Sequence, residues 1–234
     1  MLKGKRIACV LSTSLLLSTY STHQTPFRTL ATEVVKNDNF EMVQDLRLKT
    51  NYEQFIDKYE KDKTESERKK AEELKRQRLI EEQKYKDLHP HYNPYDLREI
   101  SGISVQRIYD LLSGTTYQTW DNAQAFYNSE KLQPSVNALF LIGLCNFESY
   151  YGKSGLAREN NNIVSWRLNN GWRSFNSKTE CINETAKLIS NEYLNPKGKF
   201  YNGVDLWSVG KLYCEDSVWS GKVNEMVNEL LSKK

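Results

Sequence analysis

The chain has 234 residues, of which 38% are hydrophobic and 27% are charged. This length is enough for one well-buried core, but the polar composition requires that core to be concentrated in part of the chain. The formal net charge of +3 is far below that of a nucleic-acid-binding domain, so nucleic acid is excluded as a partner.

The N-terminus has the pattern of an export signal. Basic residues up to Arg6 precede an apolar run over 7–17, and small and polar residues follow. The run is short for a membrane span, so we expect a signal peptide over 1–31, with an uncleaved signal-anchor as the alternative. Either form makes the chain secreted or attached to the cell wall or membrane, on the outer side of the cytoplasmic membrane.

A flexible linker is expected over 32–50, followed by a long charged helix over 51–89. Residues 51–88 contain no Gly or Pro, and opposite charges recur at i+3 and i+4, which supports a solvated helix. Apolar residues are sparse and hold no strict heptad, so a stable coiled coil is not required. We interpret this helix as a spacer, with self-association or binding of an assembly partner as the alternative.

Pro90 and Pro94 end that helix and mark the start of a domain over 92–234. The domain is predicted to be mainly α-helical. A polar segment rich in Asn and Gly is expected to hold either a small β-hairpin or only loops, at 160–174. The helices are expected at about 104–112, 121–129, 136–147, 177–193, 205–212 and 219–231.

One carboxylate stands out in this domain. The most apolar helix of the chain runs directly into Glu148, and Gly152 is expected to end that helix. Apolar neighbours and the negative end of the helix dipole both raise the pKa of a carboxyl group at this position. A glutamic acid that stays protonated near neutral pH can donate a proton to a departing glycosidic oxygen. On these grounds alone, a solvated helix-end glutamate is the simpler interpretation.

The segment around Glu148 resembles a known family. Phe147-Glu148-Ser149-Tyr150-Tyr151-Gly152-Lys153-Ser154 is followed by Leu156-Ala157-Arg158 and Asn161-Asn162. This order is similar to the glucosaminidase domain of bacterial autolysins, glycoside hydrolase family 73, whose pattern includes E-S-x-x-G-x-S, small-L-A-[KR] and N-N-L-F-G. Flanking segments extend the resemblance over roughly 96–232, including Tyr213 and a closing Trp219.

The resemblance implies a mainly α, lysozyme-like fold that cleaves the β-1,4 bond between N-acetylglucosamine and N-acetylmuramic acid in peptidoglycan glycan strands. It makes Glu148 the general acid, and it requires no cofactor and no metal. The residues expected to contact substrate are Tyr151, Asn161, Asn162, Trp166 and Tyr213. Ser149 and Ser154 are expected to brace and cap the turn.

The chain departs from the family in two respects. Ile163-Val164-Ser165 and then Trp166 stand where the family has L-F-G, which implies an altered groove. Residues 160–174 also contain no Asp or Glu to act as a second carboxylate. Asp216 is the candidate for that role, although helix capping is the simpler one. Retaining, inverting and substrate-assisted mechanisms therefore stay open, since the separation of two carboxylates distinguishes the first two.

Two other functions remain open from the sequence. A muramidase or lytic transglycosylase keeps the fold and Glu148 and cuts the other glycosidic bond. An inactive wall-binding or assembly protein is the alternative from a different class, suggested by the altered Asn-Asn segment and the long charged helix. If the signal is cleaved, the remaining cysteines are Cys145, Cys181 and Cys214. An odd number of cysteines favours buried thiols over a disulfide framework.

Overall fold

A computed structural model describes the backbone of residues 41–233 and the side chains of residues 50–233. The predicted signal segment and residues 32–40 of the predicted linker lie outside the described residues. Within the described part of the chain, no helix is both long and apolar enough to cross a membrane. Two units are distinguished, one ending at Lys69 and the other beginning at Lys70, and each is considered by itself.

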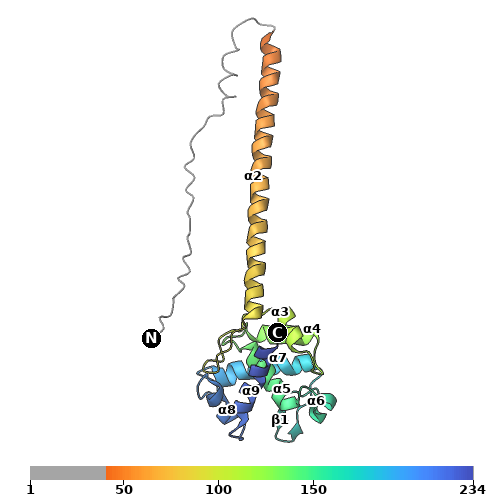
Figure 1. Ribbon diagram of the computed structural model, residues 1–234, viewed down its shortest axis with the longest axis vertical. Helices are drawn as coiled ribbons and strands as arrows, with labels where there is room; N and C mark the ends of the chain where they lie inside the picture. Colours follow the sequence, from red (N-terminus) through yellow and green to blue (C-terminus); the bar gives the residue numbers. More distant parts are fainter. Residues whose placement is uncertain (1–40, 234) are drawn as a thin grey trace, which may run out of the picture. The chain divides into compact units, whose positions relative to one another are not determined.

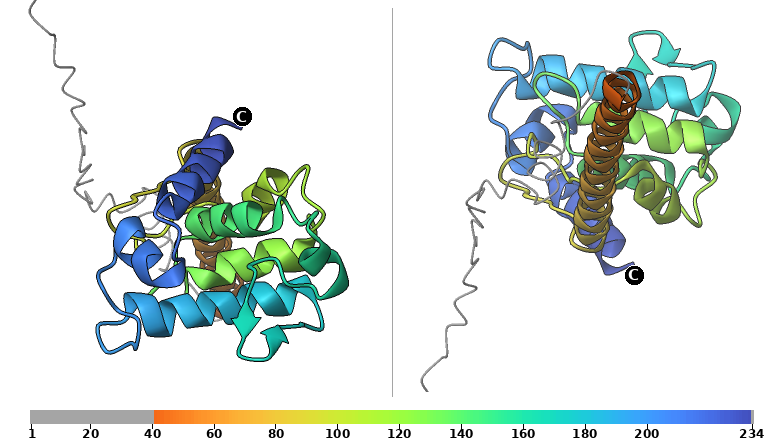
Figure 2. Two further views of the ribbon diagram at one scale, coloured as in Figure 1. Left: turned by 90° about the horizontal axis from the view of Figure 1, so that it is seen from below. Right: turned by 90° about the horizontal axis from the view of Figure 1, so that it is seen from above.

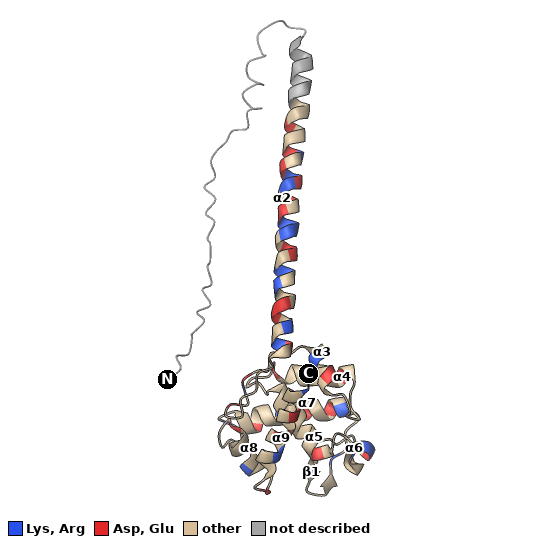
Figure 3. Cartoon of the chain, in the orientation of Figure 1, with Lys and Arg blue, Asp and Glu red and all other residues tan. Residues whose placement is uncertain are grey.

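The long charged helix is present as α2, Glu41–Leu88. It begins earlier than expected, because residues 41–50 also contain no Gly or Pro, so the part of the predicted linker from residue 41 is helical. Acidic and basic residues alternate along its described side chains (Figure 3). Exposed side chains of opposite charge pair one turn apart, such as Glu65 with Arg68 at 2.9 Å, as expected for a solvated helix.

The last turns of α2 are hydrogen-bonded to the residues that follow it. Asp87 accepts hydrogen bonds from the backbone N–H of Ser104 at 2.6 Å and from its hydroxyl at 2.7 Å. Gln83 donates to the carbonyl oxygen of Gly102 at 3.0 Å. The end of the helix therefore belongs to the same compact unit as the residues of the C-terminal domain.

The domain is mainly helical, as predicted, and its helices surround α5 (Figures 1 and 2). In Figure 2, α4 lies between α5 and α7, and α9 packs against α5. Residues 138–146 of α5 are all buried, as is typical of a helix that is apolar on every side. The helices are α3 (Val105–Leu111), α4 (Trp120–Ser129), α5 (Ala138–Ser149), α6 (Gly155–Glu159), α7 (Lys178–Leu188), the π-helix η1 (Ile189–Leu194), α8 (Leu206–Tyr213) and α9 (Trp219–Ser232).

Two features of the secondary structure were not specified by the sequence patterns. The polar segment does contain a hairpin, in which β1 (Arg167–Leu168) pairs antiparallel with β2 (Gly171–Trp172). The short helix α6 was not predicted, although Ser154 does cap it, accepting a hydrogen bond from the N–H of Ala157 at 3.2 Å. A mainly α domain with a small β lobe, preceded by a long charged helix, is thus confirmed.

The N-cap that opens α7 is formed by Ser177 as expected, while Glu180 reaches the residue before the cap and not Ser177 itself. The hydroxyl of Ser177 accepts from the N–H of Glu180 at 3.0 Å, and the Glu180 carboxylate accepts from the N–H of Asn176 at 2.6 Å. We expect Ser177→Ala to lower the free energy of unfolding by about 1 kcal/mol. Thermal unfolding measures this as a drop in Tm of roughly 2–4 °C, whereas the exposed Lys187→Ala on the same helix should leave Tm nearly unchanged. Equal changes in Tm for the two substitutions would show that the Ser177 cap does not stabilise α7.

Candidate active site

Glu148 lies one residue before the end of α5, where the buried helix approaches the start of α9. Its side chain is half-buried, and its Oε1 accepts a hydrogen bond from Nε1 of Trp219 at 2.8 Å. Trp219 is the first residue of α9 and is only 1% exposed. An apolar helix and a buried indole ring thus hold a single carboxyl group at the edge of the core.

The surroundings of Glu148 favour its neutral form. Burial raises the pKa of the Glu148 carboxyl above its ordinary value, and this effect outweighs the hydrogen bonds from Trp219 and Ser165, which lower the pKa. The Ser165 hydroxyl itself donates to the backbone carbonyl of Glu148 at 3.1 Å. The raised pKa that the sequence predicted for a general acid is therefore found at this position.

The turn after Glu148 differs from the prediction. The helix ends at Ser149 and not at Gly152, because Tyr150 already adopts a left-handed conformation with φ of 52°. Ser149 braces the turn as expected: its hydroxyl donates to the carbonyl of Cys145 at 2.6 Å and accepts from the N–H of Gly152 at 2.7 Å. Gly152 has φ of 81°, and a Cβ there would lie 2.3 Å from Oγ1 of Thr116, so glycine is required.

Backbone strain is concentrated around this turn. The non-glycine residues with positive φ in the described chain are Tyr150, Tyr151, Asn161 and Ser165, all shortly after Glu148. A bulky residue in this conformation costs about 1–3 kcal/mol and persists only where the surrounding contacts enforce it. Such residues cluster at functional sites, which makes the segment from residue 148 to 166 the candidate active site.

The two asparagines of the motif hold the following loop together. Asn162 is 0% exposed, and its Nδ2 donates to the carbonyls of Trp166 and Arg173 at 2.9 Å each, while its Oδ1 accepts from the N–H of Trp166 at 2.9 Å. Asn161 donates from Nδ2 to the carbonyl of Phe175 at 3.0 Å. In this structure both side chains are used to brace the loop that carries Ser165 and Trp166.

The rings of Trp166 and Tyr213 pack against different neighbours. The Trp166 ring is partly buried, 6.0 Å from the ring of Phe175 and 4.6 Å from the guanidinium of Arg173. The Tyr213 ring, at the end of α8, lies 4.9 Å from the Trp219 ring, and its hydroxyl donates to the carbonyl of Val164 at 3.4 Å. The structure therefore brings Tyr213 into the cluster of Trp219 and Glu148.

The side chains of Tyr151 and Asp216 have hydrogen-bond partners other than Glu148. The Tyr151 hydroxyl donates to Oε2 of Glu229 at 2.7 Å. Glu229 follows Trp219 by ten residues, which is about 15 Å along an α-helix, so the Tyr151 hydroxyl and the Glu148 carboxyl contact opposite ends of α9. Asp216 is exposed, and its Oδ1 accepts from the N–H of Val218 at 3.0 Å, which is a capping contact before α9.

Sequence reasoning missed the roles of Trp219 and Ser165. Trp219 appeared only as an aromatic residue in a closing segment, yet it donates directly to Glu148 across 71 residues of sequence. Ser165 appeared only as a departure from the family pattern. No local periodicity or cap signals either contact. The sole indication was that both residues lie in segments that resemble the family.

The three cysteines in the described part of the chain are free thiols. Cys145 and Cys181 are buried and Cys214 is partly exposed, which agrees with the expectation of buried thiols for the first two. Burial raises the pKa of the Cys181 thiol to about 11 and that of Cys145 well above its ordinary value. Both thiols therefore remain protonated and unreactive near neutral pH.

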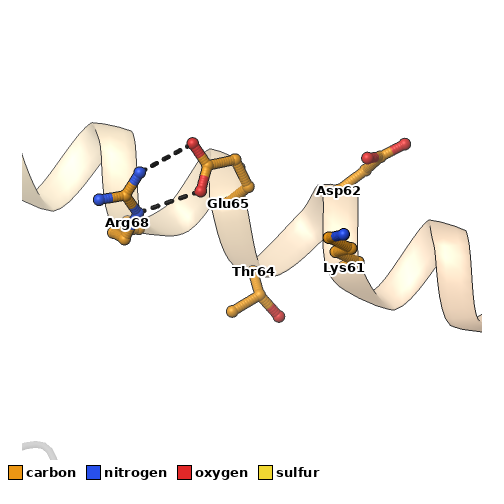
Figure 4. A pocket seen from close by; sticks show the side chains of 5 residues that line it. All are labelled: Lys61, Asp62, Thr64, Glu65 and Arg68. Carbon is orange, nitrogen blue, oxygen red and sulfur yellow. Dashed lines mark hydrogen bonds and ion pairs between the residues drawn. The ribbon is translucent and has the colours of Figure 1, made fainter.

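A depression of about 370 Å³ lies on the surface of α2, and Figure 4 shows the side chains that line it. It is lined by Lys61, Asp62, Thr64, Glu65 and Arg68, which come from neighbouring turns of one helix. Its side chains are largely charged, and the Glu65–Arg68 pair spans part of it. This is the groove between side chains of a solvated helix, unlike ligand clefts, which are lined predominantly by hydrophobic and aromatic residues.

Ionisation of Glu148 is expected to oppose folding. Because the folded-state pKa is raised, the stabilising contribution of the neutral group is fully present below the unfolded pKa of about 4.3 and is lost as pH rises through the folded-state pKa. Glu148→Gln cannot ionise, so it should have a higher Tm than wild type at about pH 8 and no such advantage at about pH 4. Thermal unfolding across this pH range checks the sign, and a Tm difference independent of pH would contradict it.

No family model and no curated protein matches this chain. Solved structures of S. aureus autolysin E do match. One is a complex with the muropeptide NAM-L-Ala-D-iGlu, with 20% identity, 62% of this chain and 74% of that chain covered, and a TM-score of 0.48. Another is a catalytic mutant in complex with the disaccharide NAG-NAM, with 19% identity, 62% and 75% coverage, and a TM-score of 0.48.

Proposed function

We propose that the chain is a peptidoglycan hydrolase that cleaves the β-1,4 bond between N-acetylglucosamine and N-acetylmuramic acid, with Glu148 as the general acid. The observation that carries the proposal is the environment of Glu148, a half-buried carboxyl with a raised pKa at the end of a buried helix. This carboxyl lies within the motif that resembles the autolysin glucosaminidases. Neither the motif nor the environment would suffice without the other.

The chemistry follows from the neutral carboxyl. As the bond between the anomeric carbon and the glycosidic oxygen breaks, its electron pair goes to that oxygen, which takes the proton of Glu148. The sugar left behind develops oxocarbenium character, and Glu148 becomes a carboxylate. Its hydrogen bond from Trp219 becomes stronger at that moment, because the acceptor is now charged.

Completion of the reaction needs a second group. This group is either a base that activates the attacking water or a nucleophile that attacks the sugar before water does. Burial, Trp219 and Ser165 set the pKa of Glu148, and none of these is a second carboxylate. The N-acetyl group of the substrate and Asp216 are the two candidates. Asp216→Asn keeps an oxygen that can accept from the N–H of Val218, so the fold should survive. Retained activity in this variant favours the N-acetyl group, and a loss comparable to that of Glu148→Gln favours Asp216.

The same proposal covers location and partners. The basic and apolar N-terminus supports export to the outer side of the cytoplasmic membrane, where the glycan strands are found. The exposed, ion-paired side chains of α2 support a spacer in preference to a tightly packed dimer, because no large hydrophobic side chain is exposed between Tyr59 and Leu74 to continue an apolar seam. Sedimentation of the chain at several concentrations distinguishes a monomer from self-association.

The test is digestion of purified peptidoglycan followed by mass spectrometry. Products with N-acetylglucosamine at the reducing end are expected. Reducing-end N-acetylmuramic acid would indicate a muramidase, and anhydro-muramic products would indicate a lytic transglycosylase, which also uses a single glutamate. Wall binding without any cleavage would favour the inactive binding protein. Glu148→Gln is run beside wild type, and a mock purification from cells without the chain serves as the contaminant control.

A further inference from the structure

Trp219 gives the two oxygens of Glu148 different roles. Its Nε1 donates to Oε1 at 2.8 Å. An indole N–H can only donate, so Oε1 must be an acceptor whether Glu148 is neutral or ionised. In the neutral group, the carbonyl oxygen is the stronger acceptor. The hydrogen bond therefore favours the form in which the proton is on Oε2.

The indole ring is held in place by its neighbours, so its N–H can determine which oxygen of Glu148 accepts the hydrogen bond. It is 1% exposed, and the ring of Tyr213 packs against it with centroids 4.9 Å apart and planes inclined by 30°. The backbone N–H of Trp219 donates to the carbonyl of Asp216 at 3.1 Å, which fixes the start of α9. A large ring packed in this way cannot turn its N–H to follow a moving carboxyl group, so the carboxyl must take its orientation from the ring.

We propose that Trp219 is a positioning residue for the acid: its indole N–H holds Oε1 as acceptor, so that Oε2 carries the proton and delivers it to the glycosidic oxygen. This inference rests on the proposed function of Glu148. In the step itself, the proton passes from Oε2 to the leaving oxygen, and the C–O electron pair goes to that oxygen. The charge left on the carboxylate is stabilised at Oε1 by the same N–H.

A neutral donor suits this task. A Lys or Arg at the same distance would keep the carboxyl ionised and remove the proton to be donated. The titratable groups that face Glu148 are Cys145 on α5 and Tyr213 on α8, and burial raises the pKa of both well above their ordinary values. Both are uncharged in the pH range where a glutamate titrates. The loop contributes Ser165, which does not titrate.

The first test uses the full chain without altering the core. In ¹⁵N–¹H spectra, the Trp219 indole resonance should shift with pH, with the same midpoint as the ¹³C resonance of the Glu148 carboxyl. That shift should vanish in Glu148→Gln. A Trp219 indole resonance that does not change as Glu148 titrates would overturn the proposal. This test needs no substitution at Trp219, so it holds even if no variant at that position folds.

The second test replaces the donor. Trp219→Phe should raise the pKa of Glu148, because the hydrogen bond that favours the carboxylate is gone. It should also lower kcat on the order of tenfold, with KM little changed, and move the basic limb of the pH profile to higher pH. Trp207→Phe is the matched control, since Trp207 lies on α8 and is exposed. It should change neither the pKa nor kcat.

The double variant separates positioning from mere packing. If Trp219 acts through Glu148, then Glu148→Gln with Trp219→Phe should be no less active than Glu148→Gln alone. A further tenfold loss, or an unchanged pKa in a folded Trp219→Phe, would overturn the inference while leaving the proposed function intact. A wild-type chain that cleaves no peptidoglycan would overturn the proposed function, and the positioning role with it.

Discussion

Glu148→Gln is expected to lower peptidoglycan hydrolysis by roughly 10²- to 10⁴-fold, the usual contribution of a general acid. The amide keeps an oxygen that can accept from Trp219, so the site should stay assembled while the transferable proton is lost. Release of soluble fragments from purified peptidoglycan measures the rate. The loss should appear in kcat, because the proton is needed in the transition state and not for binding.

Glu159→Gln is the matched control for this experiment. Glu159 ends the short helix α6, eleven residues after Glu148, and its side chain is exposed. It should retain wild-type activity. Circular dichroism of both variants establishes that the fold is intact. Comparable activity in Glu148→Gln and wild type, with the contaminant control clean, would remove Glu148 from the reaction.

Gly143→Ala is expected to destabilise the domain by about 1–3 kcal/mol, the usual cost of overpacking a core. Gly143 lies in the buried part of α5 that packs against α9. A Cβ there would lie 2.6 Å from Cγ2 of Val227 and 3.3 Å from the backbone oxygen of Val223. Valine is stiff at χ1 in a helix, so the two helices must move apart to accept the extra methyl group.

Gly221→Ala is the same substitution at an exposed position, and it is expected to stabilise the domain. Gly221 lies on the exposed side of α9, and a Cβ there would meet nothing within 4 Å. Alanine in a helix is about 0.5–1 kcal/mol more favourable than glycine, so this variant should be stabilised. Urea unfolding monitored by circular dichroism measures both changes. If the two substitutions shift stability in the same direction, the close packing of α5 on α9 does not limit stability.

The location of helices was predictable because their signals are local. The capping pair Ser177 and Glu180 and the charge pattern of α2 act within one or two turns, so neighbouring residues suffice to predict them. The ends were less predictable. α5 stops at Ser149 because the Ser149 hydroxyl and the packing of Gly152 against Thr116 enforce the turn, and Thr116 is remote in sequence.

The candidate acid was predictable for a different reason. Glu148 follows an uninterrupted apolar helix, and such a helix must be buried, so its final carboxyl is drawn toward the core and the pKa rises. The helix pattern therefore indicated that the pKa of Glu148 is raised, and the resemblance of the surrounding motifs selected Glu148 as the candidate acid. The same reasoning grouped Tyr151 with Glu148 because they are neighbours in the chain, although the Tyr151 hydroxyl contacts the far end of α9.

Only the tertiary structure decided what surrounds the carboxyl. Trp219 meets Glu148 across 71 residues because α9 packs on α5 and α8 supports the indole ring through Tyr213. Burial patterns show that a helix face is covered, but not which side chain covers a given atom. Glu148 was thus indicated as the candidate acid by its motif and by the apolar composition of the helix that carries it, because burial of that helix follows from its composition. The donor that orients it depends on how separate helices meet, which no local pattern specifies.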